Sequence, residues 1–245
     1  GAISGAGGIT KTGDGTVTLS GANTYLGPTN IGTAGGSAVG ALTLGANNVL
    51  PDTTVNIYSG TLDVNSRTDT IGALNLGGGA SGTTGILSTT TGVITLGGNL
   101  TYDASNNPNG ATITTSSTGG LSLGASRTFT IGDSSAAARD LSISAVLSGA
   151  TFGITKSGAG TLALSGANTY TGTTTVSQGT LQLDANAPSG SAGTLGNAAT
   201  AVTINDGSTG ANNTALLIGT SGVTVGRDVS VANSGTGTTT IGGNA

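Results

Sequence analysis

The sequence predicts an all-β chain wound as a single-stranded parallel β-solenoid. Three observations lead to this fold class: an internal repeat, many short strand-like segments at even spacing, and a shortage of large side chains. Repetition is weighed first, because a missed repeat leads to a wrong architecture for the whole chain. Residues 1–245 are interpreted as one continuous solenoid segment, since the texture of strands and turns does not change along them.

The internal repeat has a first copy that begins at Gly8 and a second that begins at Gly153. The run Leu-Ser-Gly-Ala-Asn-Thr-Tyr is identical at residues 19–25 and 164–170. With the strand-like segments that follow, the two signature repeats extend over about 8–44 and 153–183. The copies are too far apart to be two halves of one small β-sandwich, which favours the solenoid over a sandwich or a barrel.

Strand-like segments fill the chain, and no segment shows the apolar stripe of a helix. Most of them alternate an apolar residue with Thr, Ser, Asn or Asp, as expected for a strand with one buried and one exposed face. Clusters of Gly, Asn and Asp between them indicate turns. The expected strands are 16–20, 41–44, 54–58, 61–64, 73–76, 92–96, 111–114, 121–123, 128–131, 141–143, 161–164, 180–183, 201–204, 223–225, 229–231 and 238–241.

A coil of three strands of about five residues and three turns of about three contains roughly 24 residues. The chain then makes about ten coils, and at about 4.8 Å per coil the rod is on the order of 50 Å long. We expect Asn23 and Asn168 at equivalent corners, bonded to neighbouring backbone, and Tyr25 and Tyr170 at the edge of the core. The side chains expected to face inward include Val17, Leu19, Leu162, Leu164, Leu181 and Leu183.

The composition excludes several classes of protein. Only 7% of the residues are charged and the net charge is −4, whereas an ordinary domain has about 25% charged residues. Disorder is disfavoured, because 35% of the residues are hydrophobic and recur at short intervals. The six basic residues are scattered and give no footprint for nucleic acid. No apolar run approaches the roughly 20 residues that cross a bilayer.

The sequence predicts no catalytic, cofactor-binding or metal-binding residues. It has neither His nor Cys, which removes the Ser and Cys triads and most zinc sites. Glycoside hydrolysis needs two carboxyl groups about 5–10 Å apart beside a sugar-binding cleft, and the acids here are isolated and without aromatic neighbours. We interpret the acids as turn-forming residues. The candidate pairs are Asp63 with Asp69, Asp133 with Asp140, and Asp184 with Asp206.

Four weaker patterns give further expectations. Arg67 with Asp69 and Arg139 with Asp140 are interpreted as solvated pairs. Lys11 and Lys156 follow the same Ile-Thr step, which suggests an isopeptide bond, but a surface position is favoured because no Glu exists to assist that reaction. The single sequences at 13–15 and 205–207 are weak signals for calcium. Three threonine pairs have the two-residue spacing of an ice-binding face, but no fixed coil length aligns them. They are Thr16 with Thr18, Thr112 with Thr114, and Thr238 with Thr240.

The signature repeat resembles the passenger-associated transport repeat of bacterial autotransporters. The shared pattern is Lys-Thr/Ser-Gly-x-Gly-Thr-Leu-x-Leu-Ser-Gly-Ala-Asn-Thr-Tyr-x-Gly-x-Thr, followed by Gly-Thr-Leu-x-Leu, and it covers 156–173 and 179–183. The earlier copy starts at Lys11 and departs from the pattern at Pro28 and at the insertion 35–36, where a bulge is expected. The resemblance implies a right-handed parallel β-helix that is extracellular, often displayed at the cell surface, and engaged in adhesion or aggregation.

Three functions remain open at this stage. The favoured one is a non-catalytic structural and adhesive rod, extracellular or at the bacterial cell surface. Its expected partners are further repeats of the same chain, copies of itself, or glycans and proteins of a host or cell surface, with no nucleic acid and no membrane insertion. The second is a filament subunit that stacks through open solenoid ends. The third, which is disfavoured, is a polysaccharide-active enzyme.

Overall fold

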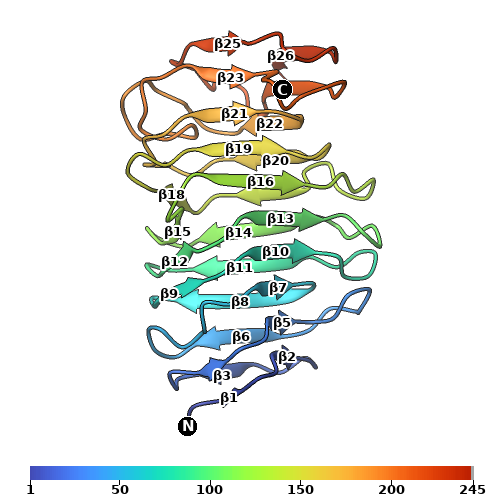
Figure 1. The fold of residues 1–245 in the computed structure, drawn as a ribbon, viewed down its shortest axis with the longest axis vertical. Coiled ribbons are helices and arrows are strands. Elements are labelled where there is room, and N and C mark those ends of the chain that lie inside the picture. The colour runs from blue at the N-terminus through green and yellow to red at the C-terminus, as the bar shows by residue number, and fades with distance from the viewer. Residues whose placement is uncertain (244–245) are drawn as a thin grey trace.

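The chain forms a parallel β-helix, in which each coil lies on the one before it (Figure 1). A computed structural model describes residues 1–243, and these contain strands, turns and loops but no helix. Accordingly, no described segment is a helix long and apolar enough to cross a membrane. The predicted parallel solenoid of about ten coils is confirmed, because the strands are parallel and each of two long sheets has ten of them.

The first long sheet runs the length of the molecule with one strand from each coil. Its strands are β2 (Ile9–Lys11), β5 (Thr29–Ile31), β7 (Val55–Ile57), β10 (Leu74–Gly77), β13 (Leu100–Asp103), β16 (Arg127–Ile131), β19 (Ile154–Ser157), β21 (Thr174–Val176), β23 (Val202–Ile204) and β25 (Val229–Val231).

The second long sheet is built in the same way from the strand that follows in each coil. Its strands are β3 (Val17–Leu19), β6 (Ala41–Leu44), β8 (Gly60–Asn65), β11 (Gly85–Thr89), β14 (Ala111–Thr115), β17 (Leu141–Ile143), β20 (Thr161–Leu164), β22 (Gly179–Leu183), β24 (Thr214–Ile218) and β26 (Thr239–Gly243).

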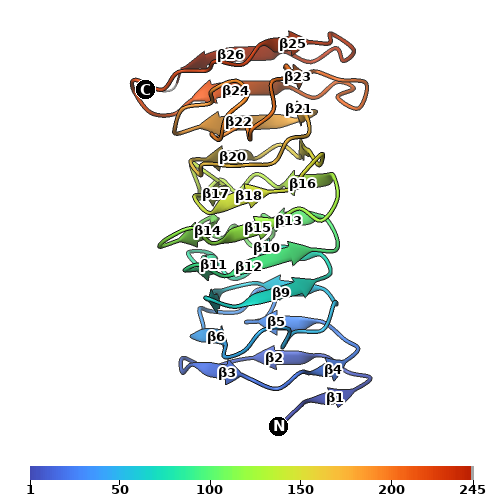
Figure 2. The same ribbon diagram turned by 90° about the vertical axis from the view of Figure 1, so that its left-hand side faces the viewer.

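The third side of the coil is regular only in the middle of the rod (Figure 2). There a four-stranded sheet contains β9 (Thr68–Ile71), β12 (Val93–Leu96), β15 (Gly120–Ser122) and β18 (Val146–Ser148). Near the N-terminus a separate pair joins β1 (Ser4–Gly5) to β4 (Thr24–Tyr25). The expectation of three strands in every coil is therefore wrong for the outer coils, where side chains replace strand pairing on this side.

The core is a set of apolar columns that run along the rod axis. In the second long sheet, Leu62, Leu87 and Ile113 pair in successive coils, and the column continues through Ile143, Leu164 and Leu183. All of these side chains are buried. Full burial of one such side chain contributes about 1.5–3 kcal/mol. A thin interior of small residues is therefore sufficient because every coil adds to it.

Coil length varies, and the loops absorb the difference. The coil that separates Ile9 from its partner Thr29 is short, whereas the coil that separates Leu100 from its partner Phe129 is much longer. The coil length predicted from the sequence falls between these two. The insertion in the first signature repeat lies in the long loop between β5 and β6, which confirms the expected bulge.

Two sequence-based expectations about strands and burial need correction. Residues 223–225 form no strand, because this segment follows a turn and only Val225 makes an isolated bridge, to Ala187. Val17 pairs in register with the buried Leu42 and so faces the interior, but it lies in the first coil and is 45% exposed. The other five predicted inward side chains are buried.

Candidate functional site

Each signature repeat contains a short coil. Ile9 pairs with Thr29 and Ile154 pairs with Thr174, so the coils of the two copies have the same length. A short coil leaves little chain for the third side, and the backbone groups there need other hydrogen-bond partners. The distinctive side chains of the repeat supply them.

The asparagine of each signature repeat joins the coil before it to the coil after it. Asn168 Oδ1 accepts a hydrogen bond from Leu147 N at 2.8 Å, and Asn168 Nδ2 donates to Thr194 O at 2.8 Å. Asn23 likewise accepts from Ile3 N and donates to Val49 O. Both side chains are buried. The prediction that the two asparagines occupy equivalent corners and bond neighbouring backbone is confirmed.

A buried aspartate also bonds the backbone of a neighbouring coil where the third side lacks an asparagine. Asp69 Oδ2 accepts hydrogen bonds from Val49 N and Leu50 N, each at 2.9 Å, in the preceding coil. Burial raises the pKa of Asp69, and these backbone hydrogen bonds oppose that shift. The residue is 1% exposed, so its interpretation as a turn residue solvated beside Arg67 is wrong.

The lysine of each signature repeat is buried at a corner, contrary to the expected surface position. Lys156 Nζ donates to the carbonyl oxygens of Ser157, Gly158 and Gln178 at 2.6–3.0 Å. Lys11 Nζ donates to two corner carbonyls in the same way. Burial lowers the pKa of Lys156 to about 7, against the opposing effect of Asp140. The ammonium group thus ties together carbonyl groups that the sharp corner leaves without strand partners.

The tyrosine of each repeat lies inside the core rather than at its edge. Tyr25 is 2% exposed and Tyr170 is 0% exposed. The Tyr170 hydroxyl is hydrogen-bonded to the Thr174 hydroxyl at 2.7 Å, and Tyr25 makes the equivalent contact with Thr29. The Tyr–Thr pair links the third side of the coil to the first long sheet.

We expect the buried Tyr170 to make the protein sensitive to alkali. Burial raises the pKa of Tyr170 to about 12, against about 10 for tyrosine in an unfolded chain. Between these values the folded state retains a proton that the unfolded state loses, so the free energy of unfolding falls as pH rises through this window. The expected loss is on the order of 3 kcal/mol.

Urea unfolding at pH 9 and pH 12 measures this effect. The Tyr170→Phe variant should lose less stability than the wild type over this interval, whereas Tyr58→Phe, which alters a half-buried ring, should follow the wild type. An equal loss in the wild type and in Tyr170→Phe would contradict the assignment.

Glycine completes the signature, because two backbone segments touch at its positions. A Cβ atom on Gly153 would lie 2.1 Å from Thr173 O, and one on Gly8 would lie 2.2 Å from Pro28 O. Contacts this short between a Cβ and backbone do not occur in folded proteins. Only glycine therefore allows the short coil to close.

The acids of the candidate pairs, interpreted above as turn residues, make several kinds of contact within residues 1–243. Asp206 accepts a hydrogen bond from Ser208 N, as predicted for a turn residue. Asp63 accepts one from Asn65 N but lies within β8, beside a shift in strand register, so its interpretation as a turn residue is wrong. Asp140 differs, because its two oxygens accept from Ser134 N and Thr161 N at 2.7 and 2.8 Å and it is buried. Burial raises the pKa of Asp140. Both of its oxygens are thus occupied by backbone.

The single ion pair among residues 1–243 joins Arg139 to Asp184 at 3.2 Å. The expected Arg139–Asp140 pair is therefore wrong, because Asp140 is turned into the core while Arg139 reaches across to a later coil. The same described residues contain no group of three or more acidic side chains placed to hold a metal ion.

The threonine pairs considered for an ice-binding face lie at or beside β3, β14 and β26, which are not adjacent coils. A different hydroxyl column exists in the first long sheet, where register aligns Thr128, Thr155, Thr175, Thr203 and Ser230. The sequence did not reveal this column, because the coils that contribute to it differ in length.

Stacked coils, shared registers and side-chain bridges between coils define a parallel β-helix repeat protein. The family model for the passenger-associated transport repeat matches residues 9–36 and 154–183, which contain the two short coils described above. The chain is therefore a parallel β-helix that carries two of these repeats, an arrangement consistent with an autotransporter passenger. This repeat implies secretion or surface display. No curated protein and no solved structure gives a significant match.

Proposed function

We propose that the chain is a non-catalytic structural and adhesive section of an extracellular passenger. The observation that carries this proposal is that the polar side chains of the signature repeats are engaged inside the protein. Lys156, Asn168 and Tyr170 are buried, and their polar atoms are bonded to other groups of the protein. The same is true of the first copy. Residues bonded in this way stabilise the rod. Partners therefore contact its outer faces.

The outer faces favour adhesion through neutral polar contacts. Their outward side chains are mainly Thr, Ser and Asn, and charged residues make up only 7% of the chain. Hydroxyl and amide groups form hydrogen bonds that salt does not screen, whereas contacts between exposed charges weaken as ionic strength rises. We therefore expect adhesion that is insensitive to salt.

Beads coated with the purified chain test this function. We expect them to aggregate or to adhere to cells equally at 0.05 M and 0.5 M NaCl, while beads coated with an unrelated acidic protein do not. Incubation with a panel of polysaccharides should release no new reducing ends. Adhesion that disappears at the higher salt, or cleavage of any polysaccharide, would count against the proposal.

A filament subunit is the second candidate, because both ends of the described rod expose apolar side chains of their coils. Val17 is 45% exposed in the first coil, and Val231 and Ile241 are 44% and 56% exposed in the last. Further coils of a longer chain would cover these residues, and so would another copy of this one. Electron microscopy of the purified 245-residue chain distinguishes the two, since only a filament subunit forms long fibres.

A further inference from the structure

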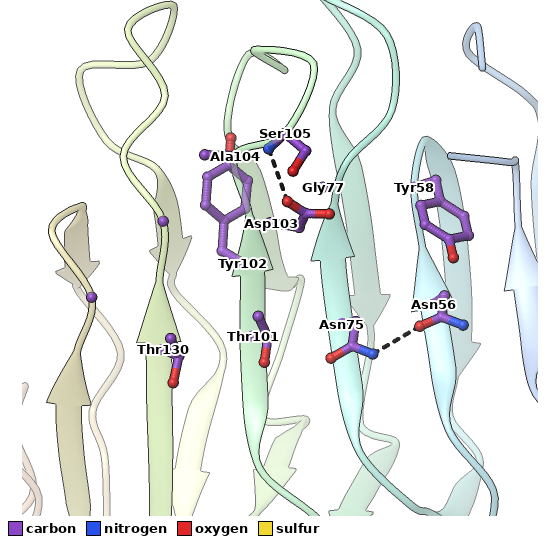
Figure 3. Close-up of a pocket in the computed structure, with 12 residues that line it drawn as sticks. Asn56, Tyr58, Asn75, Gly77, Thr101, Tyr102, Asp103, Ala104, Ser105 and Thr130 are labelled. Atoms are coloured by element: carbon purple, nitrogen blue, oxygen red, sulfur yellow. Dashed lines mark hydrogen bonds between the residues drawn. The ribbon is translucent and has the colours of Figure 1, made fainter. Parts of the chain in front are cut away.

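A groove lies on the outer face of the first long sheet. It has a volume of about 550 Å³ and lies over β7, β10, β13 and β16 (Figure 3). Its floor is one register column of outward side chains, Asn56, Asn75, Thr101 and Thr130. Beside this column the groove is bounded by Tyr58 and by the turn that begins at Asp103.

Glycine residues open the space between the aromatic ring and the carboxylate. Gly77 pairs with Asp103 in the adjacent coil. A Cβ atom on Gly78 would lie 2.7 Å from Asp103 Oδ2 and 3.5 Å from Tyr58 Cδ1. The ring of Tyr58 and the carboxylate of Asp103 therefore stand on either side of a stretch of backbone that bears no side chain.

Several polar atoms of the groove have no hydrogen bond within the described chain. Asp103 Oδ1 accepts from Ser105 N at 2.8 Å, but Oδ2 has no such partner. Asn75 Nδ2 donates to Asn56 Oδ1 at 2.8 Å, which fixes the amide and leaves Asn75 Oδ1 without a partner in residues 1–243. The Tyr58 hydroxyl is likewise unbonded there. The groove thus presents acceptors and the ring of Tyr58 in a fixed arrangement, whereas Tyr102, which also lines it, is buried.

The charge of the groove selects the class of ligand. Asp103 is the one charged side chain among the residues that line it, and no Lys or Arg is present. Phosphate, sulfate, uronate and sialic acid groups would be repelled, because a carboxylate without a neighbouring cation disfavours a second anion. A neutral sugar instead offers hydroxyl donors to the acceptors and an apolar face to the tyrosine ring.

We propose that this groove binds neutral oligosaccharides, with one sugar ring packed on Tyr58 and a hydroxyl group donating to Asp103 Oδ2. The proposal rests on the adhesive function above and names its partner. With a single carboxyl group the groove lacks the pair that glycoside hydrolysis needs. The saccharide is therefore bound and not cleaved.

Tyrosine fluorescence gives a direct measure of this binding. The chain has no Trp and four Tyr, and Tyr25, Tyr102 and Tyr170 are buried, so an outer-face ligand perturbs Tyr58. Neutral oligosaccharides of hexoses and of N-acetylhexosamines are titrated into the purified chain, with sulfated, uronate and sialylated oligosaccharides and a peptide library in parallel. At least one neutral oligosaccharide should change the fluorescence with saturation in the millimolar range or below.

Four variants locate the site. Tyr58→Ala should weaken binding about tenfold or more, since tenfold corresponds to about 1.4 kcal/mol of lost contact, while Tyr58→Phe retains the ring and should change it less than about threefold. Asp103→Asn keeps an acceptor for Ser105 N but replaces the unbonded oxygen with a donor, and should also weaken binding. Thr175→Ala, on the same sheet outside the groove, is the control. Binding to the variants is followed by calorimetry, because Tyr58 is the fluorescent reporter.

The proposal is overturned if no neutral oligosaccharide binds, if only acidic oligosaccharides or peptides bind, or if Tyr58→Ala and Asp103→Asn bind as the wild type does. If Tyr58→Ala does not fold, the binding affinity of Asp103→Asn decides whether the groove is the site, because this variant preserves the turn. Beads that carry Tyr58→Ala and still adhere as the wild type would reject the groove while leaving the adhesive function intact.

Discussion

Replacement of Asn168 by Ala is expected to lower the free energy of unfolding by about 2–6 kcal/mol, because it leaves two buried backbone groups without partners at about 1–3 kcal/mol each. These groups are Leu147 N and Thr194 O, on opposite sides of the short coil. In a repeat protein the loss is felt first at the coil boundary, since stability is a sum of coils and of contacts between neighbours. Urea unfolding measures the global effect, and hydrogen exchange at Leu147 N measures the local one.

Two further variants show whether hydrogen bonding is the cause. Asn109→Ala alters an exposed asparagine whose side chain makes no hydrogen bond within residues 1–243, and stability should be unchanged within about 0.5 kcal/mol. Asn168→Asp keeps the acceptor for Leu147 N but places a second oxygen against Thr194 O. A protonated carboxyl can donate to that oxygen, so this variant should regain stability as pH falls. If Asn168→Ala unfolds as the wild type does, the bridge has no importance for stability.

The first copy of the repeat should respond more weakly. Asn23 makes the equivalent bonds, but its upstream partner lies at the exposed N-terminal coil, where Ile3 is 39% exposed. Water can replace part of a lost hydrogen bond there. The difference in stability loss between Asn23→Ala and Asn168→Ala therefore shows how much the effect of the asparagine depends on whether its coil is terminal or internal.

Much of the fold could be predicted from the sequence, because each strand has its own short alternating pattern. Alternation of Leu with Thr or Gln in segments such as 161–164 and 180–183 identifies strands of the second long sheet, and their columns follow from stacking. Strands such as β5 and β21 were missed, since three residues beginning with a buried Thr give too short a pattern to recognise. The irregular third side could not be predicted, because strand propensity does not indicate which backbone groups side chains will satisfy.

The buried polar groups show where sequence reasoning failed. Lys156 and Asp69 belong to residue types that are almost never buried unless paired, so each was expected at the surface. Repetition of Ile-Thr-Lys at both signature coils was the available signal, since a solvated lysine has no reason to recur at the same corner. The groove was missed for a different reason: Tyr58 and Asp103 are far apart in sequence, and the register that brings their coils together depends on loop lengths.

Replacement of Gly153 by Ala is also expected to destabilise the second signature coil strongly. The added Cβ would lie 2.1 Å from Thr173 O and 2.8 Å from Thr173 N, and neither backbone atom can move without breaking the bond from Ile154 N to Thr173 O. Overpacking typically costs about 1–3 kcal/mol, and we expect about 3 kcal/mol here because the clashing atoms are backbone. We expect a clear fall in the urea midpoint and rapid hydrogen exchange at Ile154 N.

Gly15→Ala provides the matched control, because Gly15 belongs to the first signature repeat and a Cβ there meets nothing within 4 Å. This substitution should leave stability unchanged or raise it by up to about 1 kcal/mol, since alanine restricts the unfolded chain more than glycine does. If Gly153→Ala were as stable as Gly15→Ala, the two coils could not approach as closely as the short signature coil requires. The register between β19 and β21 would then be wrong, and with it the explanation of why the repeat contains glycine at this position.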